Sequence, residues 1–125
     1  VINLDRFKDF NDTLGHRPAD AILKLVAQRL RHQMPPTDFV ARLGGNEFAV
    51  LRRCGQLSDT DSLSLDIMAA FAEPFDVNGH VFDISASVGI ANSTSDRATE
   101  DLIRDAEIAM REAKARNRGG VDTFA

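Results

Sequence analysis

A Gly-Gly pair, Gly44-Gly45, separates two short apolar segments and limits what the middle of this chain can form. The segments cover residues 39–41 and 48–51, and glycine readily adopts the positive φ that tight hairpin turns need, so the pattern predicts a β-hairpin. Glycines also let another molecule approach the backbone, and N–H groups at such a turn can bind a phosphate. Asn46 and Glu47 follow directly, which places an amide and a carboxylate at the hairpin tip. These residues alone are also compatible with a purely structural turn.

The composition is that of a globular chain in a reducing compartment. At 125 residues and 43% hydrophobic, the chain has enough apolar residues for a core. A net charge of −4 argues against a general nucleic-acid binder. A single cysteine, Cys54, excludes an internal disulfide. No apolar run reaches the about 20 residues of a membrane span, so we expect a cytoplasmic protein without membrane contact through this segment.

Periodicity and turn residues predict alternating helices and hairpins. Ile22, Val26 and Leu30 recur every four residues, which predicts an amphipathic helix over 18–33. Along 80–91 apolar and polar residues alternate, the period of one half-buried strand. The other predicted elements are a buried strand over 1–4, a helical segment over 5–12 that Gly15 ends, strands over 38–43 and 47–52, a helix over 57–71, a strand over 74–77 joined by an Asn78-Gly79 turn to the next, a helix capped by Thr99 and an edge strand over 121–125. This order predicts an α/β fold, a sandwich with a central mixed or antiparallel sheet flanked by helices.

Four segments, in order along the chain, share one family's motifs. They are Asn3-Leu4-Asp5-Arg6-Phe7-Lys8 with Asn11-Asp12 and Gly15-His16, then Gly44-Gly45-Asn46-Glu47-Phe48, then Ser87-Val88-Gly89-Ile90-Ala91, and finally residues 105–114 with Arg118. Together they resemble the GGDEF domains of bacterial diguanylate cyclases, which join two GTP into cyclic di-GMP. The resemblance implies a nucleotidyl-cyclase-like sandwich. It also implies one GGDEF-type domain over 1–125, cut from a longer signalling protein, because family members normally carry another helix before the first strand.

The resemblance also assigns a GTP site. Asn11 and Asp20 match the residues that read guanine, and an amide with a carboxylate can pair with its O6, N1–H and N2–H groups. Lys114 and Arg118 match the residues that hold the triphosphate, where lysine supplies a point charge and arginine a forked grip. Further contacts are expected from the backbone at the start of the first helix and from the hairpin glycines, at Arg6, Phe7, Lys8, Gly44 and Gly45. Without the resemblance, a turn residue, a first-turn acid and a solvated helix end would explain the four side chains.

The signature departs from the family at the metal site. The resemblance places the metal ligands, Mg or Mn in the family, at Asn3, Leu4 and Asn46. Active members carry acids at the first and last of these positions, and magnesium prefers carboxylates. Two amides remove two negative charges, so weak metal binding and an impaired catalytic pair, Asn46 and Glu47, are expected. Asp5 remains in a supporting position.

A second departure concerns feedback by the product. Many cyclases bind cyclic di-GMP through an Arg-x-x-Asp shortly before the hairpin. The matching residues here are Pro35-Pro36-Thr37-Asp38, without the arginine, so we expect no product-inhibition site.

Three functions remain open at this point. The favoured hypothesis is a degenerate GGDEF domain that binds GTP and regulates a covalently linked EAL phosphodiesterase or sensory domain. The first alternative is an active cyclase, which needs two domains facing each other and therefore a homodimer. The second alternative is a dimerisation or docking module that binds no nucleotide.

Overall fold

The computed structural model describes residues 1–53, 58–93, 98–116 and 119–124. Cys54 and Arg118 lie outside these ranges. The elements in chain order are β1 (Ile2–Leu4), α1 (Phe7–Leu14), α2 (His16–Gln33), β2 (Phe39–Gly44), β3 (Glu47–Leu51), α3 (Ser58–Ala70), β4 (Phe75–Val77), β5 (His80–Phe82), β6 (Ala86–Ile90), α4 (Thr99–Arg116) and β7 (Val121–Thr123).

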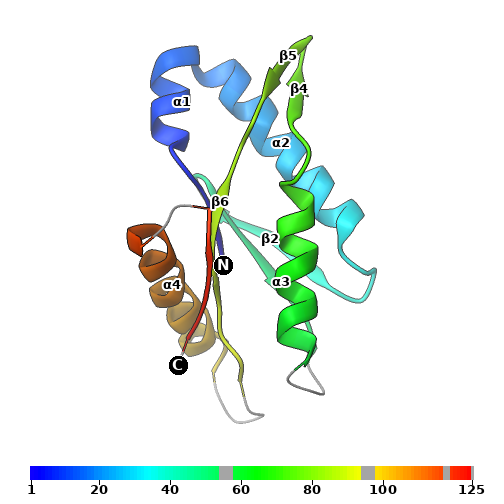
Figure 1. The fold of residues 1–125 in the computed structure, drawn as a ribbon, viewed down its shortest axis with the longest axis vertical. Coiled ribbons are helices and arrows are strands. Elements are labelled where there is room, and N and C mark those ends of the chain that lie inside the picture. The colour runs from blue at the N-terminus through cyan, green and yellow to red at the C-terminus, as the bar shows by residue number, and fades with distance from the viewer. Residues whose placement is uncertain (54–57, 94–97, 117–118, 125) are drawn as a thin grey trace.

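The central sheet is mixed, as the order of elements predicts. Its strand order is β2-β3-β1-β6-β7, and every neighbouring pair is antiparallel except β6 with β7. Strands β4 and β5 form a separate hairpin. Figure 1 shows α4 on one side of β6 and α3 on the other, so helices flank the sheet. The expected α/β sandwich is therefore confirmed.

Apolar and polar side chains alternate along β1, β3 and β6, so the sheet has one apolar face and one polar face. Ile2 lies opposite both Phe48 and Val88, and all three are fully or almost fully buried in the core. Ile22, Val26 and Leu30 of α2 belong to the same core, which confirms the amphipathic helix. Residues one position along each strand point to the opposite face, towards α4.

The prediction of one half-buried strand over 80–91 is wrong in two respects. The segment divides into β5, which pairs with β4, and β6, which lies between β1 and β7. Every residue of β6 is buried, because α4 covers the face that the alternation left for solvent. The helix comes so close that a Cβ built on Gly89 would lie 2.0 Å from the Ala106 carbonyl oxygen.

The predicted Asn78-Gly79 turn and the predicted helix stop at Gly15 are both present. Asn78 and Gly79 have φ of 52° and 88°, the left-handed conformations that a two-residue hairpin turn requires. The Gly79 N–H donates to Asp76 Oδ1 at 2.8 Å, which stabilises that turn. Gly15 ends α1 with φ of 88°, as expected for a helix stop.

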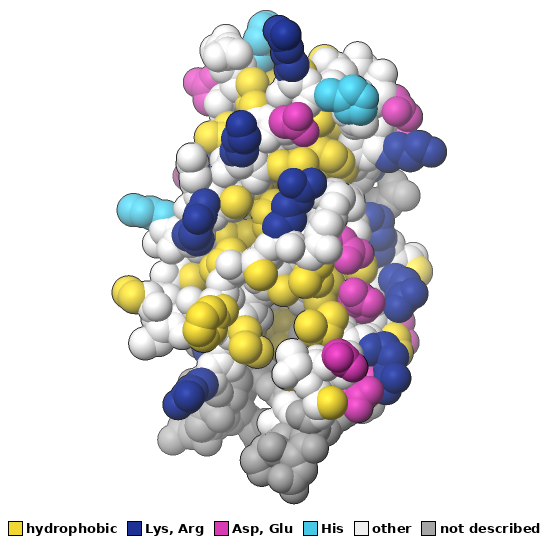
Figure 2. Space-filling view, turned by 180° about the vertical axis from the view of Figure 1, so that it is seen from behind, with side chains coloured by type: hydrophobic (Ala, Val, Ile, Leu, Met, Phe, Trp, Pro, Cys, Tyr) yellow, Lys and Arg dark blue, Asp and Glu magenta, His cyan; other side chains and the backbone are white. Residues whose placement is uncertain are grey.

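An apolar hollow lies on one face of the molecule. Figure 2 shows hydrophobic side chains gathered over the middle of that face, where the surface is concave. A cavity of about 480 Å³ is lined mostly by apolar side chains, among them Phe39, Leu43, Leu51, Leu63, Ile90 and Leu102. Phe39 is 73% exposed and Leu51 51%. Over the ranges that the structure describes, none of the helices is both long and apolar enough to cross a membrane.

Arg29 of α2 holds the segment between α3 and β4 against α2 through side-chain contacts. Its guanidinium donates to the carbonyl oxygens of Ala70, Glu73 and Pro74 and lies 3.8 Å from the centre of the Phe75 ring. Replacing Arg29 by methionine keeps the apolar stem but leaves these carbonyls without the donor. We expect a loss of about 2 kcal/mol in the free energy of unfolding, measured by urea denaturation.

The matched control for this loss is Arg17→Met. Arg17 is an exposed residue of the same helix, so its replacement should change stability by less than about 0.5 kcal/mol. Equal losses for the two variants would show that the contacts of Arg29 do not stabilise the fold.

Candidate functional site

The register of β1 brings the polar positions together. Asn3 lies opposite Glu47 of β3 and opposite Ser87 of β6. Residues that face each other across neighbouring strands share one face of a sheet, so these three side chains lie on the side covered by α4. Lys114 of α4 reaches the same place, where its ammonium donates to Asn3 Oδ1. The site is thus assembled from three strands and one helix.

The Gly-Gly hairpin adopts the predicted turn. Gly44 and Gly45 have φ of 136° and 51°, and the register between β2 and β3 shifts at this point. Arg42 holds the turn, because its Nε and Nη2 donate to the Gly45 carbonyl oxygen at 3.1 and 2.8 Å. The Leu4 N–H donates to the Asn46 carbonyl oxygen at 3.1 Å, which joins the turn to the end of β1.

A network of amides and one ammonium occupies the centre of the site. Asn46 Nδ2 donates to the Leu4 carbonyl oxygen at 2.9 Å and to Asn3 Oδ1 at 3.4 Å. Asn3 Nδ2 in turn donates to Glu47 Oε1 at 3.3 Å. The side-chain oxygen Oδ1 of Asn3 therefore accepts from both Asn46 and Lys114, and Asn3 is only 9% exposed.

Two hydroxyl groups donate to the Asp5 carboxylate. Ser85 Oγ donates to Asp5 Oδ2 at 2.7 Å, and Ser87 Oγ donates to Asp5 Oδ1 at 2.6 Å. The Asp5 N–H donates to the Ser85 carbonyl oxygen at 2.9 Å. Both carboxylate oxygens are thus already engaged in a buried position, which fits a supporting role for Asp5.

These residues do not fit a magnesium or manganese ion. Such ions require oxygen ligands, preferably carboxylates, with free lone pairs directed at one point. Here the oxygens of Asn3 and Leu4 accept N–H groups, and an ammonium group stands beside Asn3. Among the described residues, no group of three or more Asp, Glu, His or Cys side chains is arranged to hold a metal.

The start of α1 presents backbone donors next to the site. Arg6 has φ of 55°, a left-handed conformation that is uncommon outside glycine, and the helix begins at Phe7. The first N–H groups of a helix have no partner within it and favour anions. That Arg6, Phe7 and Lys8 bind phosphate oxygens stays a prediction from the sequence.

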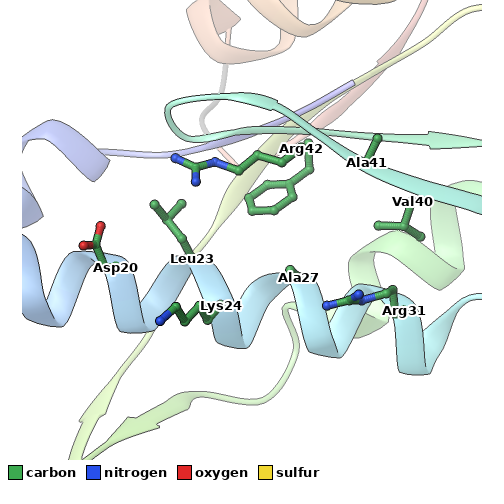
Figure 3. A pocket seen from close by; sticks show the side chains of 9 residues that line it. Asp20, Leu23, Lys24, Ala27, Arg31, Val40, Ala41 and Arg42 are labelled. Atoms are coloured by element: carbon green, nitrogen blue, oxygen red, sulfur yellow. The ribbon is translucent and has the colours of Figure 1, made fainter.

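A groove lies between α2 and β2, on the other face of the hairpin. Its volume is about 480 Å³, and Leu23, Ala27, Val40, Ala41 and Phe48 form its apolar lining. Figure 3 shows the polar groups: Asp20 and Arg42 lie towards one end of the groove, Lys24 lies one turn along α2 from Asp20 on the side away from Arg42, and Arg31 is further along α2. The groove therefore carries three cationic side chains and one carboxylate.

Asn11 lies on α1 and does not line this groove. Its Oδ1 is buried and has no hydrogen-bond partner in the described part of the chain. Buried polar atoms usually have partners, so this amide oxygen can accept a hydrogen bond from a water molecule or from a ligand.

The predicted residues fall into two groups in space. Asn3, Leu4, Asn46, Glu47 and Lys114 form one connected cluster, whereas Asp20 lines the groove. Sequence reasoning gave no role to Arg42, Ser85 and Ser87. Their signal was position: Arg42 lies two residues before Gly44, and the serines alternate along the segment before and within β6.

Asp38, the last residue of the segment where the sequence lacks the Arg-x-x-Asp motif, is paired with an arginine that directly follows β3. Asp38, whose side chain is 2% exposed, accepts from Arg52 Nε at 2.9 Å and from Arg52 Nη2 at 2.7 Å, and Arg52 also pairs with Asp66 at 2.8 Å. The hydrogen bond with Asp38 is the main cause that raises the pKa of Arg52. Asp38 is therefore committed to a buried internal pair.

Comparison with known families agrees with this geometry. The family model described as "Diguanylate cyclase, GGDEF domain" matches residues 1–120. The chain belongs to the GGDEF family. It is thus a domain of bacterial cyclic di-GMP signalling, and the GGDEF hairpin is the turn held by Arg42.

Relatives of this GGDEF domain include proteins with further domains. The cyclic di-GMP phosphodiesterase NbdA of Pseudomonas aeruginosa is 36% identical over 124 residues, which cover 98% of this chain and 16% of NbdA. An EAL/GGDEF domain protein from M. capsulatus has a structure that matches with a TM-score of 0.90 and 36% identity, covering 99% of this chain and 81% of that one. The GGDEF domain of TpbB (YfiN) from Pseudomonas aeruginosa matches with a TM-score of 0.92 and 36% identity over 99% of this chain and 79% of that one. The chain thus spans less than a fifth of NbdA.

Proposed function

We propose that this chain is a degenerate GGDEF domain that binds GTP as a regulatory module and has little or no cyclase activity. The observation that carries the proposal is the hydrogen bond between the side chains of Asn3 and Asn46, with the Lys114 ammonium on the same Asn3 oxygen. Amides and an ammonium occupy the positions where active family members hold acids and metal ions.

Cyclisation is impaired by this arrangement because it moves charge onto phosphate. The 3′-hydroxyl of one GTP must lose a proton and attack the α-phosphorus of the other, and pyrophosphate must leave with its negative charge. Metal ions normally neutralise that charge and activate the hydroxyl. Asp5 is bound by two serines and Glu47 accepts from Asn3, so both of these carboxylates already accept hydrogen bonds from the chain.

Several side chains and backbone groups support nucleotide binding. Asp20 stands at the end of a groove with three basic side chains, and the unpartnered oxygen of Asn11 is buried in the neighbouring helix. Guanine offers N1–H and N2–H donors that suit these acceptors, whereas adenine does not. Backbone N–H groups at the start of α1 and the Lys114 ammonium are suited to the phosphates.

A regulatory role is supported by the other domains that occur together with related GGDEF domains. NbdA is named for phosphodiesterase activity, and the M. capsulatus protein combines EAL and GGDEF domains. We infer that this domain is linked to an EAL or a sensory domain, and that GTP occupancy changes the activity of that neighbour. A GGDEF domain without its metal acids can respond to GTP without consuming it.

Asp20→Ala and Asn11→Ala test the guanine site. Each change removes a hydrogen-bond acceptor for guanine, so we expect GTP affinity measured by calorimetry to fall by about 10- to 100-fold for each variant. Binding to the unchanged chain should be saturable and stronger for GTP than for ATP.

Asp61→Ala is the matched control, since Asp61 is an exposed acid on α3, away from the groove. It should leave GTP affinity unchanged. Absence of saturable GTP binding to the unchanged chain would refute the proposal and favour a docking module, for which the apolar cavity beside Phe39 and Leu51 offers a surface.

An active cyclase is the second candidate, because Asp5 and Glu47 keep two of the family's acids near the hairpin. It would act as a homodimer with one GTP on each facing domain. Cyclic di-GMP formed from GTP and manganese at high protein concentration, at a rate lost in Glu47→Gln, would favour this candidate over the regulatory module.

A further inference from the structure

The position of Lys114 has a consequence for the form in which GTP binds. Its ammonium donates to Asn3 Oδ1, beside the Asn46 amide and the end of β1. An ammonium carries three N–H donors, and one of them is used on Asn3. Among the described residues the other two donors have no acceptor, so they can bind a second one.

The charge of the cluster is close to balanced without a metal ion. Lys114 contributes one positive charge, Glu47 contributes one negative charge, and Asn3 connects them through its two amide atoms. A divalent cation placed against Asn3 or Leu4 would have to displace N–H groups and would stand next to the ammonium. Like charges at such distances repel, so the site disfavours the ion.

Lys114 is held in place by the packing of its helix. Ala113, its neighbour, and Met110, one turn earlier, are buried. Met110 lies over Gly89, where a Cβ would come within 2.2 Å of the Met110 nitrogen. The helix therefore cannot shift towards the sheet, and the ammonium is presented from a rigid element.

We propose that Lys114 is the built-in cation of this site and that GTP binds as the free triphosphate, without a divalent metal ion. The inference rests on the proposed GTP binding and deepens it. In this arrangement Asn3 orients the ammonium, and the two remaining N–H donors contact phosphate oxygens. A domain of this kind responds to the concentration of GTP and is insensitive to the concentration of magnesium.

The test is calorimetric titration of the chain with GTP in magnesium and again in EDTA. We expect the two affinities of the unchanged chain to agree within about twofold. Lys114→Gln should lose about 10-fold or more in EDTA, because a charge-assisted contact with phosphate is lost. Arg111→Gln is the matched control: it removes an exposed cation from the same helix and should change neither affinity.

Manganese alone provides a second measurement that does not depend on GTP. Electron paramagnetic resonance of Mn²⁺ should show no retention by the unchanged chain, whereas the double variant Asn3→Asp/Asn46→Asp should retain the ion. Retention by the unchanged chain that is lost in Asn3→Ala would overturn the inference.

The outcomes separate the two proposals. GTP binding that needs magnesium, or that survives in EDTA with Lys114→Gln, overturns the built-in cation and leaves the GTP module in place. No GTP binding under either condition overturns the GTP module. The inference about GTP then falls with it, and the Mn²⁺ signal decides only whether the cluster excludes a metal ion.

Discussion

Changing Asn3 and Asn46 together to aspartate is expected to raise the rate of cyclic di-GMP formation by about 100-fold or more with manganese, because a single group that stabilises transition-state charge is commonly worth that much. The change restores two acids at positions whose side chains already touch at 3.4 Å. It also removes the Asn46 N–H donor from the Leu4 carbonyl oxygen, which frees that oxygen as a ligand. The measurement is product formation, quantified by chromatography.

The same variant should depend on metal for its stability. Without a metal ion, aspartates at positions 3 and 46 would stand beside Glu47 and repel one another, so the melting temperature should fall in EDTA and recover in magnesium or manganese. Asn78→Asp is the control, since it makes the same chemical change in the β4–β5 turn. If the double variant neither gains activity nor responds to metal, the two aspartates do not rebuild a metal site, which counts against the intact pocket that both the GTP module and the cyclase assume.

Local features of the fold could be predicted from the sequence. The turns at Gly45 and Asn78-Gly79 depend on residues that tolerate positive φ, and the α2 stripe of Ile22, Val26 and Leu30 depends on helical periodicity. Both signals lie within a few residues of the structure they determine. The family motifs, which extend over most of the chain, then predicted the sheet and the positions that meet in the site.

The division of 80–91 into two strands could not be predicted locally. The alternation continues without interruption from Phe82 to Ile90, yet β5 and β6 have different partners. Ser85 lies at the break, where its carbonyl oxygen accepts from the Asp5 N–H, a contact 80 residues away in sequence. The choice between one strand and two therefore depends on tertiary pairing.

The sequence predicted which residue types occupy the site, but it did not predict the contacts between them. The loss of the acids at positions 3 and 46 could be read directly, but their mutual hydrogen bond depends on the pairing of β1 with β3. The contact between Lys114 and Asn3 joins residues 111 positions apart and depends on where α4 packs. The resemblance predicted that Lys114 binds phosphate, whereas its hydrogen bond to Asn3 could be found only in the structure.

Gly89→Ala is expected to lower the free energy of unfolding by about 3 kcal/mol or more, since overpacking against backbone atoms cannot be relieved by a rotamer change. The added Cβ would lie 2.0 Å from the Ala106 carbonyl oxygen and 2.2 Å from the Met110 nitrogen, so α4 must move outwards. Denaturant titration gives the loss, and calorimetry in EDTA should show weaker GTP binding than the loss of folded protein explains, because Lys114 moves with the helix.

Gly79→Ala is the control for the substitution itself. Gly79 has φ of 88° and no atom within 4 Å of a built Cβ, so the change adds backbone strain without a clash and should lower stability by only about 1 kcal/mol. Equal losses at the two positions would show that α4 accommodates a side chain at Gly89. A large loss at Gly89 with unchanged GTP affinity of the folded fraction would show instead that the packing of α4 does not determine where the Lys114 ammonium stands. The close approach at β6 would then stabilise the fold without positioning the proposed cation.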